Sequence, residues 1–377
     1  MLEQFLQGIP AVVAAVQALT YAFFVSSCVC ALILWSGPRH LRLTARGHDR
    51  SDLQAIHRVP TPRVGGVAVF AGMITALFVL PPEARELGAA ALGSSLLLLI
   101  TGLREDLSFG ASPRARMAAA FLGSLMMIAL TGQMIGTSPV PYLQPMLSIP
   151  AFGILFTVLA GACFAHACNL VDGLNGLASG YLITFALGIA AVAVAVGDPV
   201  VGSLAGVMAA AMAGFIIFNF PRGHIFLGDA GAYVCGHVVA WLGILLLARH
   251  EGVSAYAVML MALWPVSDVL TAIVRRVRQG KSPASPDRLH LHHLVYRVVT
   301  ARLADGNPRR ANAWASVLVA PLYIGPVLTG VAMHDMGTAA LVGLAVWTGI
   351  LMAVRLLIHR QFKILARRAS PERSLLA

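Results

Sequence analysis

Four short polar stretches interrupt an almost wholly apolar chain, and three of them together carry four carboxylates. Glu105 and Asp106 are adjacent, whereas Asp172 and Asp229 stand alone beside glycines. Carboxylate oxygens suit Mg²⁺, which usually takes one or two carboxylates together with substrate phosphates. Taken singly, the acidic pair could be a solvated turn, and Asp172 or Asp229 could be a helix cap. Together they indicate a site for a metal ion and a phosphate.

Three histidines, His290, His292 and His293, fall within four residues near the carboxyl-terminal third of the chain. Zinc is one interpretation, but no cysteine pairs accompany them, and their spacing places the rings on different sides of a helix. The imidazoles can instead donate hydrogen bonds to a pyrophosphate. Surface histidines without a role are the remaining alternative. Asp268, which follows Pro265 in an apolar run, either supports this neighbouring site or satisfies a broken helix.

The composition places these groups in a membrane protein. Of the 377 residues, 58% are apolar and 11% are charged, which is too little polar surface for a soluble protein. Apolar runs near twenty residues predict helices, because backbone amides in hydrocarbon must be satisfied within the segment. We therefore predict one all-α domain over 1–377, a polytopic integral membrane helical bundle. Its eleven predicted spans are 10–36, 64–81, 87–102, 117–136, 149–168, 176–197, 200–220, 230–248, 253–274, 313–334 and 338–358.

The distribution of basic residues predicts the orientation. Lys and Arg gather in alternate loops, and among the 27 only Arg85 and Arg249 fall in the other set. Basic loops are cytoplasmic, so the N-terminus is predicted outside and the C-terminus inside. The net charge of +11 is explained by attraction to anionic headgroups, and no nucleic-acid partner is expected. The predicted cytoplasmic segments are 37–63, 103–116, 169–175, 219–229 and 275–312, together with the basic tail 359–377.

In this order, the motifs resemble those of the polyprenyl-phosphate N-acetylhexosamine-1-phosphate transferases of glycosyltransferase family 4. The motifs are Pro-Thr-Pro-Arg-x-Gly-Gly at 60–66, the acidic pair at 105–106, Asn-x-x-Asp-Gly at 169–173, Gly-Asp-x-Gly at 228–231 and His-x-His-His at 290–293. The resemblance runs from about His57 to His293. It implies a bacterial inner-membrane enzyme that binds a UDP-sugar on its cytoplasmic loops and undecaprenyl (polyprenyl) phosphate from the membrane.

The resemblance also implies a role for each motif. Glu105, Asp106 and Asp229 would be catalytic, with Asp229 and Asp106 at the metal, which would be Mg²⁺ with Mn²⁺ as an alternative. The substrate-binding residues that it implies are Arg63, Asn169, Asp172, Gly173, Asn175, Asn219, Phe226, His290, His292 and His293. Two positions depart from the family pattern, since Glu105 replaces an aspartate and Asn175 replaces a second acid.

The expected reaction transfers N-acetylhexosamine-1-phosphate to the lipid phosphate and releases UMP, initiating a cell-surface glycan such as an O-antigen. In-line attack by the lipid phosphate is favoured over a covalent aspartyl intermediate. A catalytically silent relative that binds nucleotide sugar or carrier lipid is the first alternative. An ion-coupled transporter is less favoured, because the acids gather at one face instead of the midplane. The sugar is left open, as is a homodimer.

Overall fold

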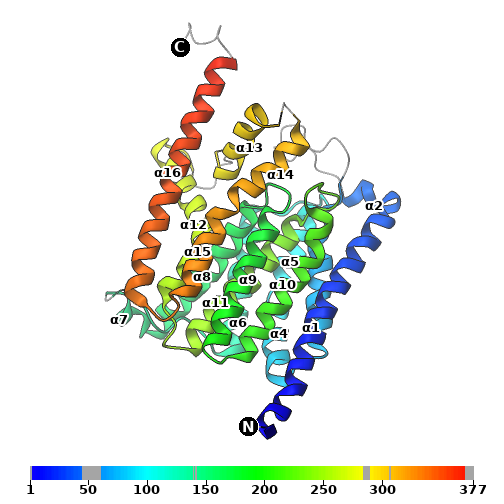
Figure 1. The fold of residues 1–377 in the computed structure, drawn as a ribbon, viewed down its shortest axis with the longest axis vertical. Coiled ribbons are helices and arrows are strands. Elements are labelled where there is room, and N and C mark those ends of the chain that lie inside the picture. Colours follow the sequence, from blue (N-terminus) through cyan, green and yellow to red (C-terminus); the bar gives the residue numbers. More distant parts are fainter. Residues whose placement is uncertain are drawn as a thin grey trace.

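The computed structural model describes residues 2–44, 61–138, 140, 142–282, 289–304 and 307–369, and every regular element within them is a helix (Figure 1). The predicted all-α class is therefore confirmed for this part of the chain. The helices are α1 (Leu2–Trp35), α2 (Gly37–Thr44), α3 (Gly65–Leu77), α4 (Pro82–Ser94), α5 (Leu96–Asp106), α6 (Pro113–Thr131), α7 (Gln144–Leu147), α8 (Pro150–Leu170), α9 (Leu177–Ala195), α10 (Pro199–Asn219), α11 (Gly228–Arg249), α12 (Ala255–Arg278), α13 (Leu291–Arg302), α14 (Pro308–Val319), α15 (Pro321–Ala332) and α16 (Gly337–Ala369).

Within the described ranges, nine helical segments are long and apolar enough to cross a membrane, with α14 and α15 forming one of them. A tenth span results if α4 and α5 are joined, although the pair is bent by 42°. The predicted span 64–81 coincides with the shorter helix α3, which ends at Leu77. A polytopic bundle is thus supported, while the number of eleven spans stays a prediction. Parts of the predicted cytoplasmic segments, at 45–60, 283–288, 305–306 and 370–377, lie outside the described residues.

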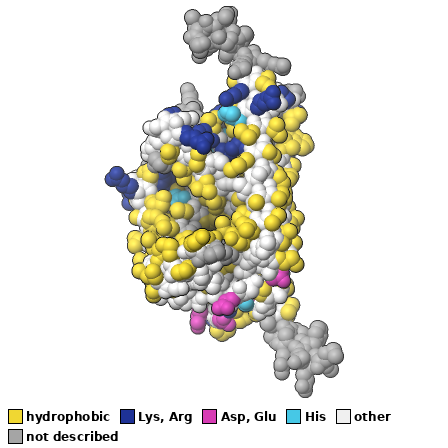
Figure 2. Space-filling model, turned by 90° about the vertical axis from the view of Figure 1, so that its left-hand side faces the viewer, with side chains coloured by type: hydrophobic (Ala, Val, Ile, Leu, Met, Phe, Trp, Pro, Cys, Tyr) yellow, Lys and Arg dark blue, Asp and Glu magenta, His cyan; other side chains and the backbone are white. Residues whose placement is uncertain are grey.

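Charge is separated along the long axis of the molecule. On the face shown in Figure 2, Lys and Arg side chains gather toward one end and Asp and Glu toward the other. The start of α1 and the end of α16 lie at opposite ends of the bundle (Figure 1). The charge rule predicts that the basic end is cytoplasmic, and the orientation of the two termini stays a prediction.

Both arginines that depart from the charge rule have partners within the protein. Arg85 donates from Nε to the Leu77 carbonyl at 3.2 Å and from Nη2 to that of Leu80 at 3.0 Å. Arg249 donates from Nε to Asp198 Oδ2 at 2.7 Å, and Asp198 also caps the first turn of α10. These two cations therefore fasten helix ends at the predicted outer face.

The centre of the bundle is α11, which is apolar on all sides and enclosed along most of its length. Such a helix is stable only when surrounded by other helices. It contacts α8, α5, α3 and α9. Its one buried histidine, His237, is within 2.9 Å of Ser94 Oγ, so this polar ring has a partner in the core.

Glycines allow two helices, α3 and α5, to converge on the first turn of α11. A Cβ at Gly66 would lie 2.2 Å from Gly231 Cα, and one at Gly102 would lie 2.4 Å from Ala230 Cα. No side chain fits at either contact. The glycines therefore let α3 and α5 approach the backbone of α11 where the predicted acidic residues lie.

We expect a non-permeant thiol reagent to label Gly252→Cys in intact cells, because this exposed residue lies in the predicted outer turn after α11. Arg309→Cys, exposed at the start of α14, should be labelled only after the membrane is opened. Labelling is measured by a mass-tag shift, with the wild-type cysteines as background. The reverse pattern would overturn the predicted orientation.

Gly66→Ala should lower the melting temperature in detergent, because the added methyl would overlap the α11 backbone. Overpacking of this kind costs about 1–3 kcal/mol or more. Gly93→Ala is the matched control, since this α4 glycine has no neighbour within 4 Å and alanine favours a helix. Equal melting temperatures for the two variants would contradict the tight contact.

Candidate active site

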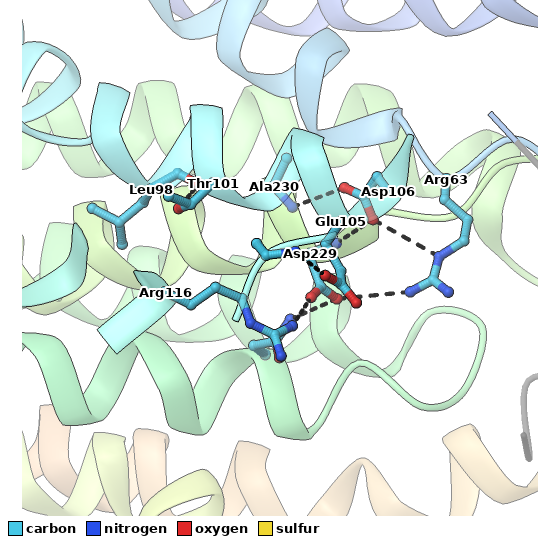
Figure 3. Close-up of polar contacts among 10 residues, drawn as sticks. Arg63, Leu98, Thr101, Glu105, Asp106, Arg116, Asp229 and Ala230 are labelled. Carbon is cyan, nitrogen blue, oxygen red and sulfur yellow. Dashed lines mark hydrogen bonds and ion pairs between the residues drawn. The ribbon is translucent and has the colours of Figure 1, made fainter. Parts of the chain in front are cut away.

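A carboxylate from one helix caps the amino terminus of another at the centre of the candidate site. Asp106, the last residue of α5, accepts from the backbone N–H of Asp229 at 2.8 Å and of Ala230 at 2.9 Å, through its two oxygens (Figure 3). The first amides of a helix have no partner within the helix and carry its positive dipole end. Asp106 therefore fixes the start of α11, and its own side chain is fully buried.

The segment before α3 pairs with the segment before α11. The Pro62 carbonyl accepts from Phe226 N–H at 2.9 Å, and Gly65 N–H donates to the Phe226 carbonyl at 2.9 Å. Between them, Gly228 has φ +77°, and a Cβ there would lie 2.0 Å from the Arg63 carbonyl oxygen. This pairing explains why a Pro-Arg-x-Gly-Gly motif and a Gly-Asp motif, far apart in sequence, form one site.

The carboxylate of Asp229 faces cationic and amide groups from three other segments. Arg116 Nη1 donates to Oδ2 at 2.7 Å, Asn169 Nδ2 donates to Oδ1 at 3.3 Å, and Arg63 Nη2 lies 3.7 Å from Oδ1. The side chain of Asp229 is 14% exposed, whereas that of Asp106 is completely buried. Asp229 is thus the acid of this pair that a ligand can reach.

Arg116 is a site residue that the sequence analysis did not single out. It lies in the first turn of α6, which Ser112 caps by accepting from Ala115 N–H at 3.1 Å. The signal was present, because Arg116 belongs to a basic loop that also carries the acidic pair. Its contact with Asp229 joins residues 113 positions apart, which no local pattern reveals.

Glu105 closes the turn that follows α5. Its Oε2 accepts from Ala111 N–H at 2.8 Å, across a turn in which Ser108 has φ +62°. Figure 3 shows the Glu105 side chain beside Asp229. The half-buried glutamate therefore lies in the site and also holds the loop leading to Arg116.

A magnesium ion fits the chemistry of these groups, and Asp229 would be its direct protein ligand. In the described part of the chain, no three His, Cys, Asp or Glu side chains form a metal-binding cluster. Mg²⁺ does not need one, since it commonly uses one or two carboxylates and completes its shell with phosphate oxygens and water. Both oxygens of Asp106 already accept from backbone N–H groups of α11, so its role in this structure is to orient Asp229. Direct ligation by Asp106 stays a prediction.

The Asn-x-x-Asp-Gly turn brings the histidine motif to the same site. A Cβ at Gly173 would lie 2.5 Å from His292 Nε2 and 3.0 Å from His293 Cε1, so the rings pack on bare backbone. His292 is fully buried, and burial, followed by the neighbouring histidines, holds the pKa of its ring well below the usual range. Neither of its ring nitrogens has a hydrogen-bond partner among the described residues.

Asp172 lies half-buried in the turn between α8 and α9. Burial raises its pKa to about 7, which the nearby Arg63 opposes and Asp229 reinforces. The carboxyl group is therefore poised between its charged and neutral forms near neutral pH.

Asp268 supports the histidine motif, which decides between the two roles left open by the sequence. Its Oδ2 lies 2.8 Å from His290 Nδ1, and its Oδ1 accepts from Leu291 N–H at 3.1 Å and from Arg355 Nη2. The helix containing Pro265 continues unbroken as α12. Arg355 was also missed, although a basic residue inside the last predicted span was a signal of function.

Two predicted substrate-binding amides lie in the protein interior. Asn219 accepts from Gly176 N–H at 2.6 Å and donates to the Ile225 carbonyl at 2.8 Å. Asn175 donates to the Pro221 carbonyl at 3.1 Å, and its own N–H donates to Asn312 Oδ1 at 2.9 Å. Both side chains hold the loop before α11, so this structure gives them a positioning role.

The half-buried Phe226 lies in that loop, where its backbone is hydrogen-bonded to Pro62 and Gly65. Nucleotide contact by Asn175, Asn219 and Phe226 stays a prediction.

Comparison with known proteins gives a consistent result. The model of the family described as "Glycosyl transferase family 4" matches residues 89–247. A decaprenyl-phosphate N-acetylglucosaminephosphotransferase of Mycobacterium tuberculosis is 30% identical over 353 residues, which cover 84% of this chain and 83% of the relative. A probable undecaprenyl-phosphate N-acetylglucosaminyl 1-phosphate transferase of Bacillus subtilis is 27% identical over 271 residues, 72% of this chain and 75% of the relative. The undecaprenyl-phosphate alpha-N-acetylglucosaminyl 1-phosphate transferase of Escherichia coli is 28% identical over 267 residues, which cover 66% of this chain and 69% of the relative.

The raised pKa of Asp172 should make folding stability depend on pH. Between the unfolded value near 4 and the folded value of about 7, the folded state holds a proton that the unfolded state has lost. Stability therefore falls as pH rises through this window, by about 1.4 kcal/mol per pH unit at most, and levels off above it. Asp172→Asn should flatten the fall in melting temperature between pH 5 and 7. Parallel profiles for both proteins would contradict the shift.

Proposed function

The chain belongs to glycosyl transferase family 4, and from this membership we propose that it transfers an N-acetylhexosamine-1-phosphate from a UDP-sugar to a polyprenyl phosphate. The family and the phosphotransferase class predicted from the sequence are confirmed by the relatives. N-acetylglucosamine is the proposed sugar, since the relatives are named for it. The proposed place is the bacterial inner membrane, where the product would begin a cell-surface glycan.

One observation carries the proposal, namely the setting of Asp229 at the start of α11. Asp229, a carboxylate that a ligand can reach, lies between Arg63 and Arg116 at the start of a buried helix. Arginine forks suit phosphate oxygens, and the carboxylate suits a divalent cation. A site that offers both to one ligand is suited to a nucleotide-sugar pyrophosphate.

In the proposed reaction, an oxygen of the lipid phosphate attacks the phosphorus that carries the sugar. The new P–O bond forms as the bond between that phosphorus and the oxygen bridging to the nucleoside phosphate breaks. UMP leaves with that oxygen, and the sugar stays on a polyprenyl diphosphate. A bound Mg²⁺ would neutralise the charge that develops on the phosphate oxygens.

The chain's own groups would position the reactants. Arg63 and Arg116 would hold phosphate oxygens, and Asp106 would keep Asp229 aimed at the same point by fixing its backbone. The lipid phosphate is already largely ionised near neutral pH, so orientation matters more than removal of a proton. Glu105, beside Asp229, would place further negative charge near the metal.

The test is release of UMP by purified protein with undecaprenyl phosphate, Mg²⁺ and a panel of UDP-N-acetylhexosamines. Release should require the lipid and a divalent cation, and EDTA should abolish it. Asp229→Asn should lower kcat/KM about 100-fold or more, since it removes charge at the proposed metal. Asp106→Asn should also lower it, because an amide cannot accept both backbone N–H groups.

Arg116→Ala and Arg114→Ala form a matched pair in this assay. Both lie in the first turn of α6, but only Arg116 contacts Asp229, whereas Arg114 is exposed. The first should lose activity about tenfold or more, and the second should resemble the wild type. A folded wild type that releases no UMP with any donor would favour the silent relative. Full activity of Asp229→Asn would overturn the assigned site.

A further inference from the structure

The last helix extends from the membrane bundle onto the helix that begins with the histidine motif. At about 1.5 Å per residue, the 33 residues of α16 span roughly 50 Å, well beyond a hydrocarbon core of about 30 Å. Figure 1 shows its end projecting past the bundle at the side of α13. It contacts both α12 and α13. The helix is thus a candidate for holding α13 in place.

Three contacts connect α16 to α13, and one of them is indirect, because it passes through the carboxylate of Asp268. Arg355 Nη2 pairs with Asp268 of α12, which in turn holds His290 Nδ1 and Leu291 N–H at the start of α13. Two further contacts lie along α13. Arg302 Nη2 donates to Gln361 Oε1 at 2.7 Å, and the Arg297 guanidinium lies 5.3 Å from the centre of the Phe362 ring. Both ends of α13 are therefore tied to α16.

The environment of Asp268 makes its arginine partner important. Asp268 is 2% exposed, and with Arg355 it borders an apolar cavity of about 290 Å³ between α12 and α16. The other walls of this cavity include Leu263, Leu344 and Leu351. A carboxylate beside such a cavity stays charged only when it is paired and hydrogen-bonded. Arg355 is the cation that the structure places on it.

The orientation of His290 depends on that charged carboxylate. A carboxylate that accepts from Nδ1 holds the ring in one orientation and keeps the proton on that nitrogen. If Asp268 lost its charge, its oxygen would be a weaker acceptor and the ring could turn. Leu291 N–H, the first amide of α13, would lose the same support.

We propose that Arg355 is a positioning residue for the transfer reaction, acting through Asp268 to fix His290 toward the phosphates of the nucleotide sugar. This rests on the proposed function and on the expectation from the sequence that the histidine motif binds the phosphates of the nucleotide sugar. Arg355 itself would touch neither substrate, and its effect would pass through the carboxylate of Asp268. The last helix thereby takes part in the site without contributing a group to it.

The experiment measures kcat and KM for the UDP-sugar with Arg355→Ala, Arg355→Lys and Asp268→Asn, each checked for melting temperature in detergent. Arg360→Ala is the matched control, because Arg360 is an exposed arginine on the same helix. We expect kcat/KM to fall about 10–100-fold in Arg355→Ala and Asp268→Asn, mainly through KM for the nucleotide sugar. Arg355→Lys should keep most of the wild-type kcat/KM, and Arg360→Ala should match the wild type.

The double variant Arg355→Ala with Asp268→Asn should lose no more than the larger single loss, because both act on one chain of contacts. Losses that multiply, or wild-type kinetics in a folded Arg355→Ala, would overturn the positioning role. If Arg355→Ala does not fold, two milder variants decide the question, namely Arg355→Lys and Asp268→Asn, which leaves the side chain equal in size. Their separate effects on kcat and on KM for the UDP-sugar are then compared with the wild type. A wild type without UMP release refutes the proposed function and this inference with it, whereas an active wild type with unaffected variants refutes the inference alone.

Discussion

The capping of α11 by Asp106 is the interaction on which the rest of the structure depends. The first amides of a helix have no partner within the helix, and in one that other helices enclose along most of its length they need acceptors from elsewhere in the protein. Asp106 supplies both acceptors from a separate helix. For the carboxylate to arrive, α5 must end beside α11, and Gly102 allows that contact. The acid is thus a structural requirement of the fold and a neighbour of the proposed chemistry at the same time.

This capping also determines the electrostatics around Asp229. Because the backbone of Asp229 is held, its side chain points away from the helix, where Arg63 and Arg116 meet it. The same guanidinium groups suit phosphate, and the same carboxylate suits a divalent cation. A nucleotide pyrophosphate that arrives with a cation would therefore exchange one set of charge pairs for another, and no charge would be left buried and unpaired. Such an exchange keeps the cost of desolvation low.

Much of this organisation could be predicted from the sequence. Apolar run lengths located most of the long helices, but not the breaks between α4 and α5 and between α14 and α15. The charge rule gathered the acids and histidines on one face. The contacts of Asn219 and Asn175 could not be predicted, because an amide that binds a base and an amide that binds a loop have the same residue type and spacing. Arg116 and Arg355 were missed for a different reason. Their partners lie 113 and 87 positions away, and only the packed fold brings them together.

The site consists of two clusters that different parts of the membrane bundle hold. One is built on the start of α11, and the other on the start of α13, where Asp268 and Arg355 fix the first residues. The two meet at the turn after α8, since Asn169 donates to Asp229 while Gly173 packs against His292. Any side chain at 173 would push the clusters apart, so the glycine sets their separation. A short turn with an amide at one end and bare backbone at the other therefore couples the metal-binding end of the proposed site to its histidine end.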